Sequence, residues 1–336
     1  MLTFSLIHIT SLVQVSETLS FNLTQLAYLC KLLNFQIHSK RLLELEDFLR
    51  KTTLTNVTVE EEAIIRNTMK GSRRLATVYR SLCVIIVFLY ALFPLIDENS
   101  GDEKKLPLPM WFPFDTNNHF GKVWFFEIFS IAIGAWTNSN LDVICVTMIT
   151  LTTCQFNIMN SRLSNLRKST DDVEEEDTVQ KALKECVIHY NDIISFQILV
   201  ETTFSLSIFG QFVFSVLVIC MTGFQMLVIS FKSVQFVLLL SYLLGQTCQI
   251  VMYCWYGQSI LDSSEAINDA CYSSEWFNCS KETQKMFLII MERSKRPVKM
   301  RAGKFFFLNL DTLMSILKSS YSYFAVLRHI YSSKFT

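Results

Sequence analysis

Charged residues are scarce in this sequence. They make up 18% of its 336 residues, whereas soluble globular proteins average about 25%. Glycine and proline are also few, with 9 and 5 residues, which excludes collagen-like repeats and low-complexity disorder. The 30 basic and 30 acidic residues cancel, so no excess of positive charge indicates a nucleic acid partner. This composition fits an apolar soluble protein or a membrane protein, and the distribution of the charges distinguishes the two.

Motifs that carry enzymatic chemistry are missing as well. The sequence has no Gly-rich phosphate loop, no nucleophile elbow and no zinc-binding helix pair. Its ten cysteines contain no Cys-x-x-Cys pair, and its five histidines are too dispersed for a metal site. We therefore predict no enzymatic activity, no cofactor and no metal, and we interpret the cysteines as small buried apolar residues.

Two long stretches carry no charge at all. Glu201 and Lys232 enclose 30 uncharged residues, and Lys232 and Asp262 enclose 29 more. A helix needs about 20 apolar residues to cross the hydrocarbon core of a bilayer, so each stretch is long enough to span it. Adjacent uncharged stretches of this length are rare in soluble proteins, and they favour an all-α membrane protein with a tight hairpin near Lys232.

The same criterion extends to further segments. Lys31 in the first of them is expected to reach an interface with its long stem, and Glu127 and Asp142 suggest that one span projects beyond the bilayer. The apolar residues 1–15 are too short to cross, and we interpret them as the remnant of a mostly missing first helix or, alternatively, as a loose or interfacial N-terminus. The complete spans are predicted at about 17–37, 75–96, 123–156, 204–230, 233–257 and 303–330.

Basic residues alternate between the segments that join these spans. Residues 38–74, 158–203 and 258–303 hold eight, five and seven basic residues, while the alternating segments hold few, among them Lys104 and Lys334. The positive-inside rule therefore predicts that the basic segments are cytosolic, with the N-terminus inside and the C-terminus outside. This orientation is the reverse of that of rhodopsin-type receptors.

Polar side chains follow one face of the last predicted span. Thr312, Ser315, Ser319 and then Ser322 or Tyr323 recur at helical spacing. Such a stripe avoids lipid, so it contacts either other helices or water. A helix–helix contact and the wall of a pore are both compatible with the pattern.

Several short motifs near the C-terminus resemble the signature of insect odorant receptors. The stretch Trp-Phe-Pro-Phe at 111–114 is similar too, although less specific. The motifs are Ala-Cys-Tyr-Ser-Ser-Glu-Trp at 270–276, Arg-Ser-Lys-Arg-Pro at 293–297, Ala-Gly-Lys-Phe-Phe at 302–306 and Ser-Tyr-Ser-Tyr-Phe at 320–324. The resemblance implies a single seven-helix membrane domain over residues 1–336, in the plasma membrane, with the orientation that the charges predict.

The resemblance also implies a function. Members of this family bind volatile odorants and assemble with a shared olfactory co-receptor into a heterotetrameric, non-selective cation channel in the lipid membrane. The cytosolic segment 258–303 would anchor the subunits, with Trp276 and Phe277 as buried contacts. By the same resemblance the last helix lines the pore, with a gate at Val326 and Ile330 and a lining of Asp311, Thr312, Ser315, Ser319 and Tyr323. Asp311 has an equally good alternative as the buried partner of a nearby lysine.

The family likeness places the odorant in the external half of the helices. Phe129, Ile133 and Trp136 recur at i, i+4 and i+7 and therefore share one helix face. Each aromatic side chain has the alternative of ordinary packing or lipid contact. The predicted pocket residues are Phe21, Phe88, Leu92, Phe129, Ile133, Trp136, Phe236 and Leu240.

Two other functions remain open at this point. A gustatory-type ligand-gated channel shares the topology, but its members usually end with a different, Gln-Phe pattern. A secondary transporter would predict internal repeats and helices broken at mid-membrane, for which Pro94 is the only candidate.

Overall fold

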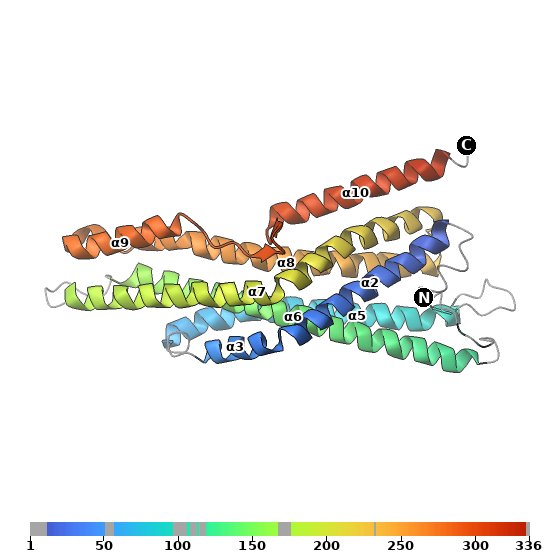
Figure 1. Ribbon diagram of the computed structural model, residues 1–336, viewed down its shortest axis with the longest axis horizontal. Helices are drawn as coiled ribbons and strands as arrows, with labels where there is room; N and C mark the ends of the chain where they lie inside the picture. Colours follow the sequence, from blue (N-terminus) through green and yellow to red (C-terminus); the bar gives the residue numbers. More distant parts are fainter. Residues whose placement is uncertain are drawn as a thin grey trace.

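The chain folds into an elongated bundle of long helices (Figure 1). The computed structural model describes residues 12–50, 57–96, 106–107, 112, 114, 119–166, 176–231 and 233–333. The elements are, in chain order, α2 (Leu12–Ile37), α3 (Ser39–Leu49), α5 (Val59–Ile96), α6 (Phe120–Asn165), α7 (Glu176–Val228), α8 (Val234–Tyr272), the 3-10 helix η2 (Trp276–Asn278), α9 (Lys281–Ser294), β1 (Arg301–Ala302), β2 (Phe306–Phe307) and α10 (Leu310–Ser333). Apart from one short hairpin, the described residues have the predicted all-α architecture.

The central helices are longer than a membrane crossing requires. Helix α7 has 53 residues and α6 has 46, so at about 1.5 Å per residue α7 extends for roughly 80 Å, against a hydrocarbon core of about 30 Å. Among the described residues, α5, α6, α7 and α8 are long and apolar enough to cross a membrane. Their excess length projects beyond the bilayer and builds a second helical region.

The N-terminal helix differs from the sequence-based expectation. Residues 1–15 were expected to be the remnant of a separate first helix, and residues 1–11 lie outside the described residues. Residues 12–15 continue without a break into the predicted span 17–37, and together they form α2. Residues 12–15 are therefore the first turn of α2 and not part of a separate helix.

The span predicted at 303–330 is also corrected. Residues 301–307 form an antiparallel hairpin, in which Arg301 pairs with Phe307 and Ala302 pairs with Phe306. Gly303 has a φ of 61°, a left-handed conformation that glycine adopts readily. The helix begins only at Leu310 and runs to Ser333, because the turn at Gly303 and the strand of phenylalanines interrupt the helical pattern.

Close backbone approaches hold this hairpin against the bundle. The Gly303 amide donates a hydrogen bond to the Ser205 carbonyl at 3.0 Å. A Cβ atom at Gly257 would lie 2.3 Å from the Leu308 carbonyl oxygen, so only glycine permits this contact between α8 and the chain that leads into α10. From this point α10 diverges from the other helices (Figure 1).

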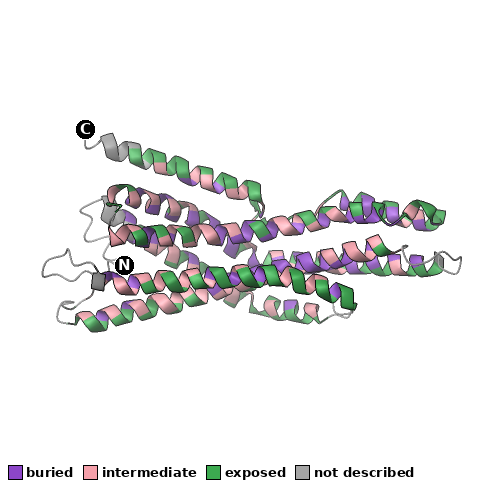
Figure 2. Cartoon of the chain, turned by 180° about the vertical axis from the view of Figure 1, so that it is seen from behind, coloured by how far each residue is buried: buried purple, intermediate pink, exposed green. Residues whose placement is uncertain are grey.

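A continuous apolar core joins the long helices. Helix α2 packs along α7, while α6 packs against both α5 and α8. Fully buried members such as Phe156, Phe196, Phe204 and Phe287 extend this core from the middle of the bundle into the region around α9. The buried positions follow the inward faces of the helices (Figure 2).

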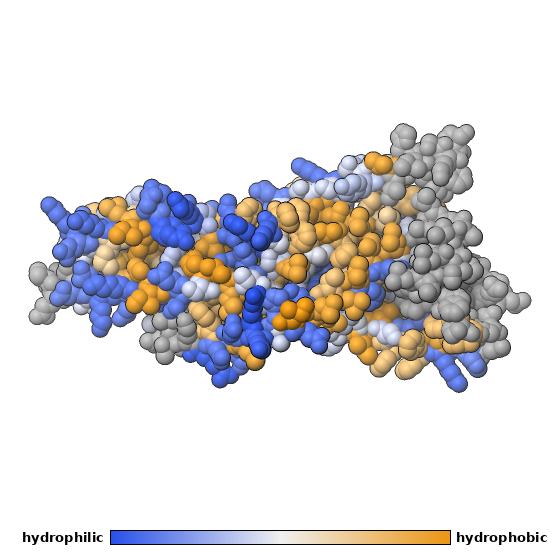
Figure 3. All heavy atoms as spheres, in the orientation of Figure 1, coloured by the Kyte–Doolittle hydropathy of each residue, from blue (hydrophilic) through white to orange (hydrophobic). Residues whose placement is uncertain are grey.

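The two ends of the molecule differ in surface chemistry. Apolar side chains gather over the half that holds α2 and α10, whereas hydrophilic side chains are more frequent around α3 and α9 (Figure 3). The segment 258–303 folds as the end of α8, η2, α9 and β1. Trp276 is half-buried, with the centroid of its ring 6.5 Å from that of Tyr272. Phe277 was predicted to be a buried contact, but it is 62% exposed in the single chain.

Candidate functional site

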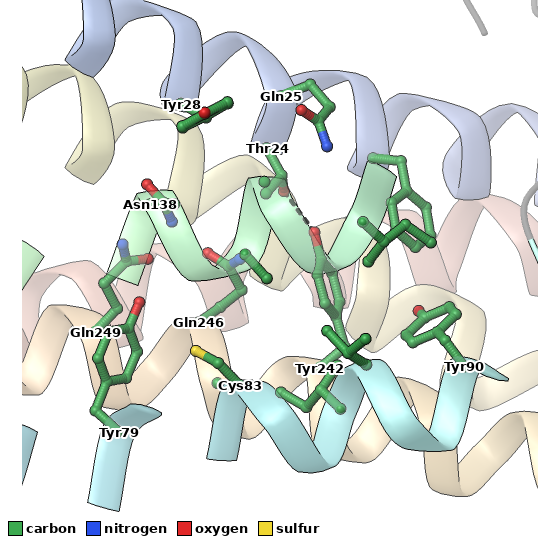
Figure 4. Close-up of a pocket in the computed structure, with 17 residues that line it drawn as sticks. Thr24, Gln25, Tyr28, Tyr79, Cys83, Tyr90, Asn138, Tyr242, Gln246 and Gln249 are labelled. Carbon is green, nitrogen blue, oxygen red and sulfur yellow. Dashed lines mark hydrogen bonds between the residues drawn. The ribbon is translucent and has the colours of Figure 1, made fainter. Parts of the chain in front are cut away.

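An internal cavity of about 120 Å³ lies between α2, α5, α6 and α8 (Figure 4). Each of the four helices contributes one stripe of side chains at helical spacing. The lining residues are Phe21, Thr24, Gln25 and Tyr28 from α2; Tyr79, Cys83, Ile86, Val87 and Tyr90 from α5; Ile131, Gly134, Ala135 and Asn138 from α6; and Tyr242, Gly245, Gln246 and Gln249 from α8.

Aromatic rings form one end of the cavity. Phe21 stacks on Tyr242 with ring centroids 5.5 Å apart, and it meets Tyr90 edge-on at 5.7 Å. The Tyr242 hydroxyl lies 2.5 Å from the Thr24 hydroxyl, which joins α8 to α2 across the cavity (Figure 4). This end combines an apolar surface with a fixed polar contact, as small-molecule sites usually do.

A buried ion pair lies behind the other end of the cavity, in contact with its lining residues Tyr79, Asn138 and Gln249. Lys31 Nζ on α2 lies 2.6 Å from Asp142 Oδ1 on α6, and their side chains are 2% and 0% exposed. Lys31 Nζ also donates to Asn138 Oδ1 at 3.0 Å. We refer to the residues that hydrogen-bond to this carboxylate as the Asp142 cluster: Lys31, Tyr79, Gln249 and Tyr253.

The Asp142 cluster corrects two expectations from the sequence. Lys31 does not extend its stem to an interface, because its ammonium group is buried and paired with Asp142. Nor does Asp142 mark a part of α6 that projects into water; it is fully buried, as is Glu127. A buried charge is tolerated where an opposite charge and further hydrogen bonds compensate its lost hydration, and Asp142 has both.

The cavity and the Asp142 cluster share side chains. Tyr79 and Gln249 line the cavity and donate hydrogen bonds to Asp142, and Asn138 lines the cavity while it accepts from Lys31. Gln249 Oε1 in turn accepts from Gln211 Nε2 on α7 at 2.8 Å. The polar end of the cavity is thus connected by hydrogen bonds to all five central helices.

Only one of the predicted pocket residues lines this cavity. Phe21 does, whereas the other seven lie outside its lining: Phe88, Leu92, Phe129, Ile133, Trp136, Phe236 and Leu240. Trp136 is 55% exposed and Phe129 and Ile133 are similarly exposed. They are offset by two residues from Ile131, Ala135 and Asn138, and two residues turn a helix by about 200°, so they point to the outside.

A different signal in the sequence indicates the helix faces that line this cavity. Polar side chains within the apolar spans recur on the inward stripes, for example Tyr242, Gln246 and Gln249 at i, i+4 and i+7. Polar residues within membrane helices usually face the protein interior. Large apolar side chains are compatible with lipid, and they therefore mark the outer surface as readily as a pocket.

The residues predicted for the pore all lie on α10. Asp311 is exposed, and among the described residues it has no ion pair with a buried lysine. Val326 and Tyr323 are each 55% exposed, while the side chain of Ile330 lies outside the described residues. Thr312 sits in the first turn, where its amide donates to Asn309 Oδ1 at 2.9 Å.

A second groove separates α10 from α7. It has a volume of about 360 Å³, and Ser315, Ser319 and Tyr323 line its α10 side. The α7 side is apolar and includes Phe212 and Val216. Ser315, Ser319 and Tyr323 thus border a space between helices within the chain, while Ser315 and Tyr323 remain exposed on the single chain.

Comparison with known proteins identifies the family. The family model described as "7tm Odorant receptor" matches residues 11–321. The chain belongs to the insect odorant receptor family. It is 27% identical over 286 residues to Odorant receptor 67c of Drosophila melanogaster, covering 79% of this chain and 67% of that protein. It is 25% identical over 348 residues to Odorant receptor Or1 of Anopheles gambiae, covering 95% of this chain and 82% of that protein.

Solved structures of an odorant receptor have the same fold. The olfactory receptor OR5 of Machilis hrabei, solved in complex with eugenol, matches with a TM-score of 0.81 at 18% identity, covering 98% of this chain and 84% of that chain. A second structure of OR5 from the same species matches with a TM-score of 0.76 at 19% identity, covering 95% of this chain and 82% of that chain. The odorant receptor family consists of multi-pass membrane receptors rather than enzymes, which decides against a gustatory receptor or a transporter at the family level.

Proposed function

We propose that this chain is the odorant-binding subunit of a ligand-gated, non-selective cation channel formed with a shared co-receptor in the plasma membrane. The observation that carries the proposal is the cavity between α2, α5, α6 and α8 in a chain of the odorant receptor family. The cavity is the proposed odorant site, in place of the seven predicted residues that lie outside its lining.

The size of the cavity favours a small ligand. Its volume is about 120 Å³, and an engineered apolar cavity of about 150 Å³ takes up benzene. Burying about 250 Å² of apolar odorant surface contributes roughly 6 kcal/mol at about 25 cal/mol/Å². The entropic cost of association offsets much of that gain, so we expect weak binding and broad tuning.

The pore assignment is part of the same proposal. Val326 and Ile330, one helical turn apart on α10, form an apolar gate that opens when it becomes hydrated. Asp311, Thr312, Ser315, Ser319 and Tyr323 line the pathway, and Trp276 and Phe277 contact neighbouring subunits. The divergence of α10 from the bundle and the exposure of Val326 and Phe277 in the single chain support this assignment.

Heterologous expression tests the function. The chain is expressed with an insect olfactory co-receptor in oocytes, and currents are recorded during application of a broad panel of volatile compounds. We expect cation currents for some compounds only when both proteins are present. Currents from this chain alone, or none from any compound despite surface expression of both proteins, would overturn the proposal.

A glycine in the cavity tests the site. Gly134 lines the cavity, and a Cβ atom at this position would have no neighbour within 4 Å, so the Gly134→Leu side chain starts in open space and takes up cavity volume. We expect a loss of odorant-evoked current of at least about tenfold, because displacing the ligand removes its burial energy. Gly121→Leu is the matched control, since it is also on α6, is equally free of neighbours and does not line the cavity. Equal responses of the two variants would place the odorant elsewhere.

A further inference from the structure

The Asp142 cluster fixes the orientation of one amide at the cavity wall. The Lys31 ammonium group has three donors and no acceptor, so the atom of Asn138 that it contacts at 3.0 Å must be the amide oxygen. The NH2 group of Asn138 is then directed away from Lys31. Asn138 lines the cavity, and its nitrogen points toward the cavity interior (Figure 4).

Two tyrosines at the cavity wall already donate their hydroxyl protons to other groups of the protein. Tyr79 donates its hydroxyl proton to Asp142 Oδ2 at 3.1 Å, because a carboxylate only accepts. Thr24 donates its own proton to the Ser20 carbonyl at 3.0 Å, so the proton between Thr24 and Tyr242 comes from Tyr242. Each tyrosine can offer a ligand only its oxygen lone pairs.

We infer that the Asn138 amide is a hydrogen-bond donor that favours odorants with an oxygen acceptor, and that Lys31 and Asp142 position it. This inference rests on the proposed function and assigns a ligand class to its site. The class is a small, single-ring compound that carries a carbonyl or another oxygen acceptor. A hydrocarbon of the same shape fills the cavity but leaves the NH2 group of Asn138 without a partner.

The comparison of two probes measures this selection. Benzaldehyde and toluene are similar in size, and only benzaldehyde has an acceptor oxygen. The readout is the ratio of their half-maximal concentrations in oocytes that express the chain with the co-receptor. One neutral hydrogen bond changes affinity by about three- to tenfold, so we expect benzaldehyde to act at a concentration about three to ten times lower than toluene.

Asn138→Asp is the most specific variant. It keeps the shape of the side chain and the contact with Lys31, but it replaces the donor NH2 group by an acceptor. Asn138→Leu removes the polar group altogether. We expect both variants to lose the preference for benzaldehyde while toluene still evokes current, whereas Asn140→Leu, two residues along α6 and outside the cavity lining, keeps the wild-type ratio.

The double variant Lys31→Met with Asp142→Leu tests the positioning role. It removes both buried charges together, and the Asn138 amide is then free to rotate. We expect the ratio of half-maximal concentrations to fall to within about twofold of unity. A merely structural role would shift the responses to benzaldehyde and toluene equally and leave their ratio unchanged.

The possible results separate this inference from the proposed function. If the broad odorant panel evokes current but the benzaldehyde-to-toluene ratio is the same in the wild type and in both Asn138 variants, the inference is overturned and the proposed function stands. If benzaldehyde evokes no current while other compounds do, the inference also fails. If no compound evokes current, the proposed function fails and the inference fails with it.

Discussion

Asp142 is fully buried and accepts hydrogen bonds from four side chains. Its two carboxylate oxygens accept hydrogen bonds from the ammonium group of Lys31, the hydroxyls of Tyr79 and Tyr253, and the amide of Gln249. Hydrogen bonds to an ionised group are about twice as strong as neutral ones. The carboxylate on α6 therefore holds side chains of α2, α5 and α8 together beside the cavity.

Removing only Lys31 should be more damaging than removing the whole pair. Lys31→Met leaves Asp142 buried without its counter-charge, and breaking a buried ion pair in this way costs about 3–5 kcal/mol. Replacing both residues, by Lys31→Met with Asp142→Leu, leaves no uncompensated charge and should recover part of that stability. The recovery is partial because Tyr79, Tyr253 and Gln249 lose the acceptor of their hydrogen bonds. Thermal unfolding of the detergent-purified protein measures the difference. If the double variant were no more stable than Lys31→Met, the unpaired charge of Asp142 would not be the cause of the lost stability.

At the scale of elements, Glu61 connects the start of α5 to the end of α6. Its carboxylate accepts from Arg162 Nε at 2.6 Å and from the Thr58 amide at 2.8 Å, while the Glu61 amide donates to Thr58 Oγ1. The reciprocal contacts of Thr58 and Glu61 form a capping box for α5. One side chain thus defines where α5 begins and attaches it to α6, on the side predicted to be cytosolic.

Two substitutions at Glu61 separate these roles. Glu61→Gln keeps a side chain that can cap α5 but loses the charge that pairs with Arg162, whereas Glu61→Ala loses both. A hydrogen bond to a charged group contributes about 1.5–3 kcal/mol and a cap about 1 kcal/mol, so Glu61→Ala should destabilise more. Thermal unfolding at neutral pH measures both variants, and equal losses would mean that the cap contributes nothing.

The pH dependence of stability should follow from the same contact. Burial raises the pKa of Glu61, but the hydrogen bonds from Arg162 and Thr58 outweigh it, so the pKa lies below its ordinary value of 4.5. The ordinary pKa of 4.5 approximates the pKa of Glu61 in the unfolded chain, so the stabilisation is fully present above pH 4.5. It is lost as the pH falls through the lower pKa of Glu61 in the folded protein. Glu61→Gln should remove this part of the acid destabilisation, which unfolding curves between neutral and acidic pH would detect.

The helices could be predicted from the sequence, but their contacts could not. The uncharged stretches between Glu201 and Asp262 led directly to the membrane parts of α7 and α8, because hydrocarbon length dictates such runs. Lys31 and Asp142 are 111 positions apart, so their pairing, and hence their burial, is invisible in either helix alone. The hairpin at Gly303 was missed because a short strand of phenylalanines has the same hydropathy as a helix.

At the scale of the whole molecule, α8 connects the cavity to α10. Its stripe from Tyr242 to Gln249 lines the cavity, and further along the same helix Gly257 contacts Leu308 just before α10 begins. The hairpin also binds α7 at Ser205. In the proposed channel, opening requires that the odorant bind the open arrangement more tightly than the closed one. A small displacement of α8 would then be transmitted to α10 through these contacts.

A charged residue at Val326 tests the far end of this connection. Val326→Glu in the proposed apolar gate keeps the constriction hydrated, because hydrophobic constrictions close by losing water. We expect current without odorant to rise severalfold in oocytes with the co-receptor, and the relative permeability of cations to change. Ala325→Glu places the same carboxylate one residue earlier, about 100° around α10, and should leave both properties at wild-type values. Unaltered permeability and gating in Val326→Glu, with surface expression intact, would exclude Val326 from the pore and require that α10 meet its neighbours through another face.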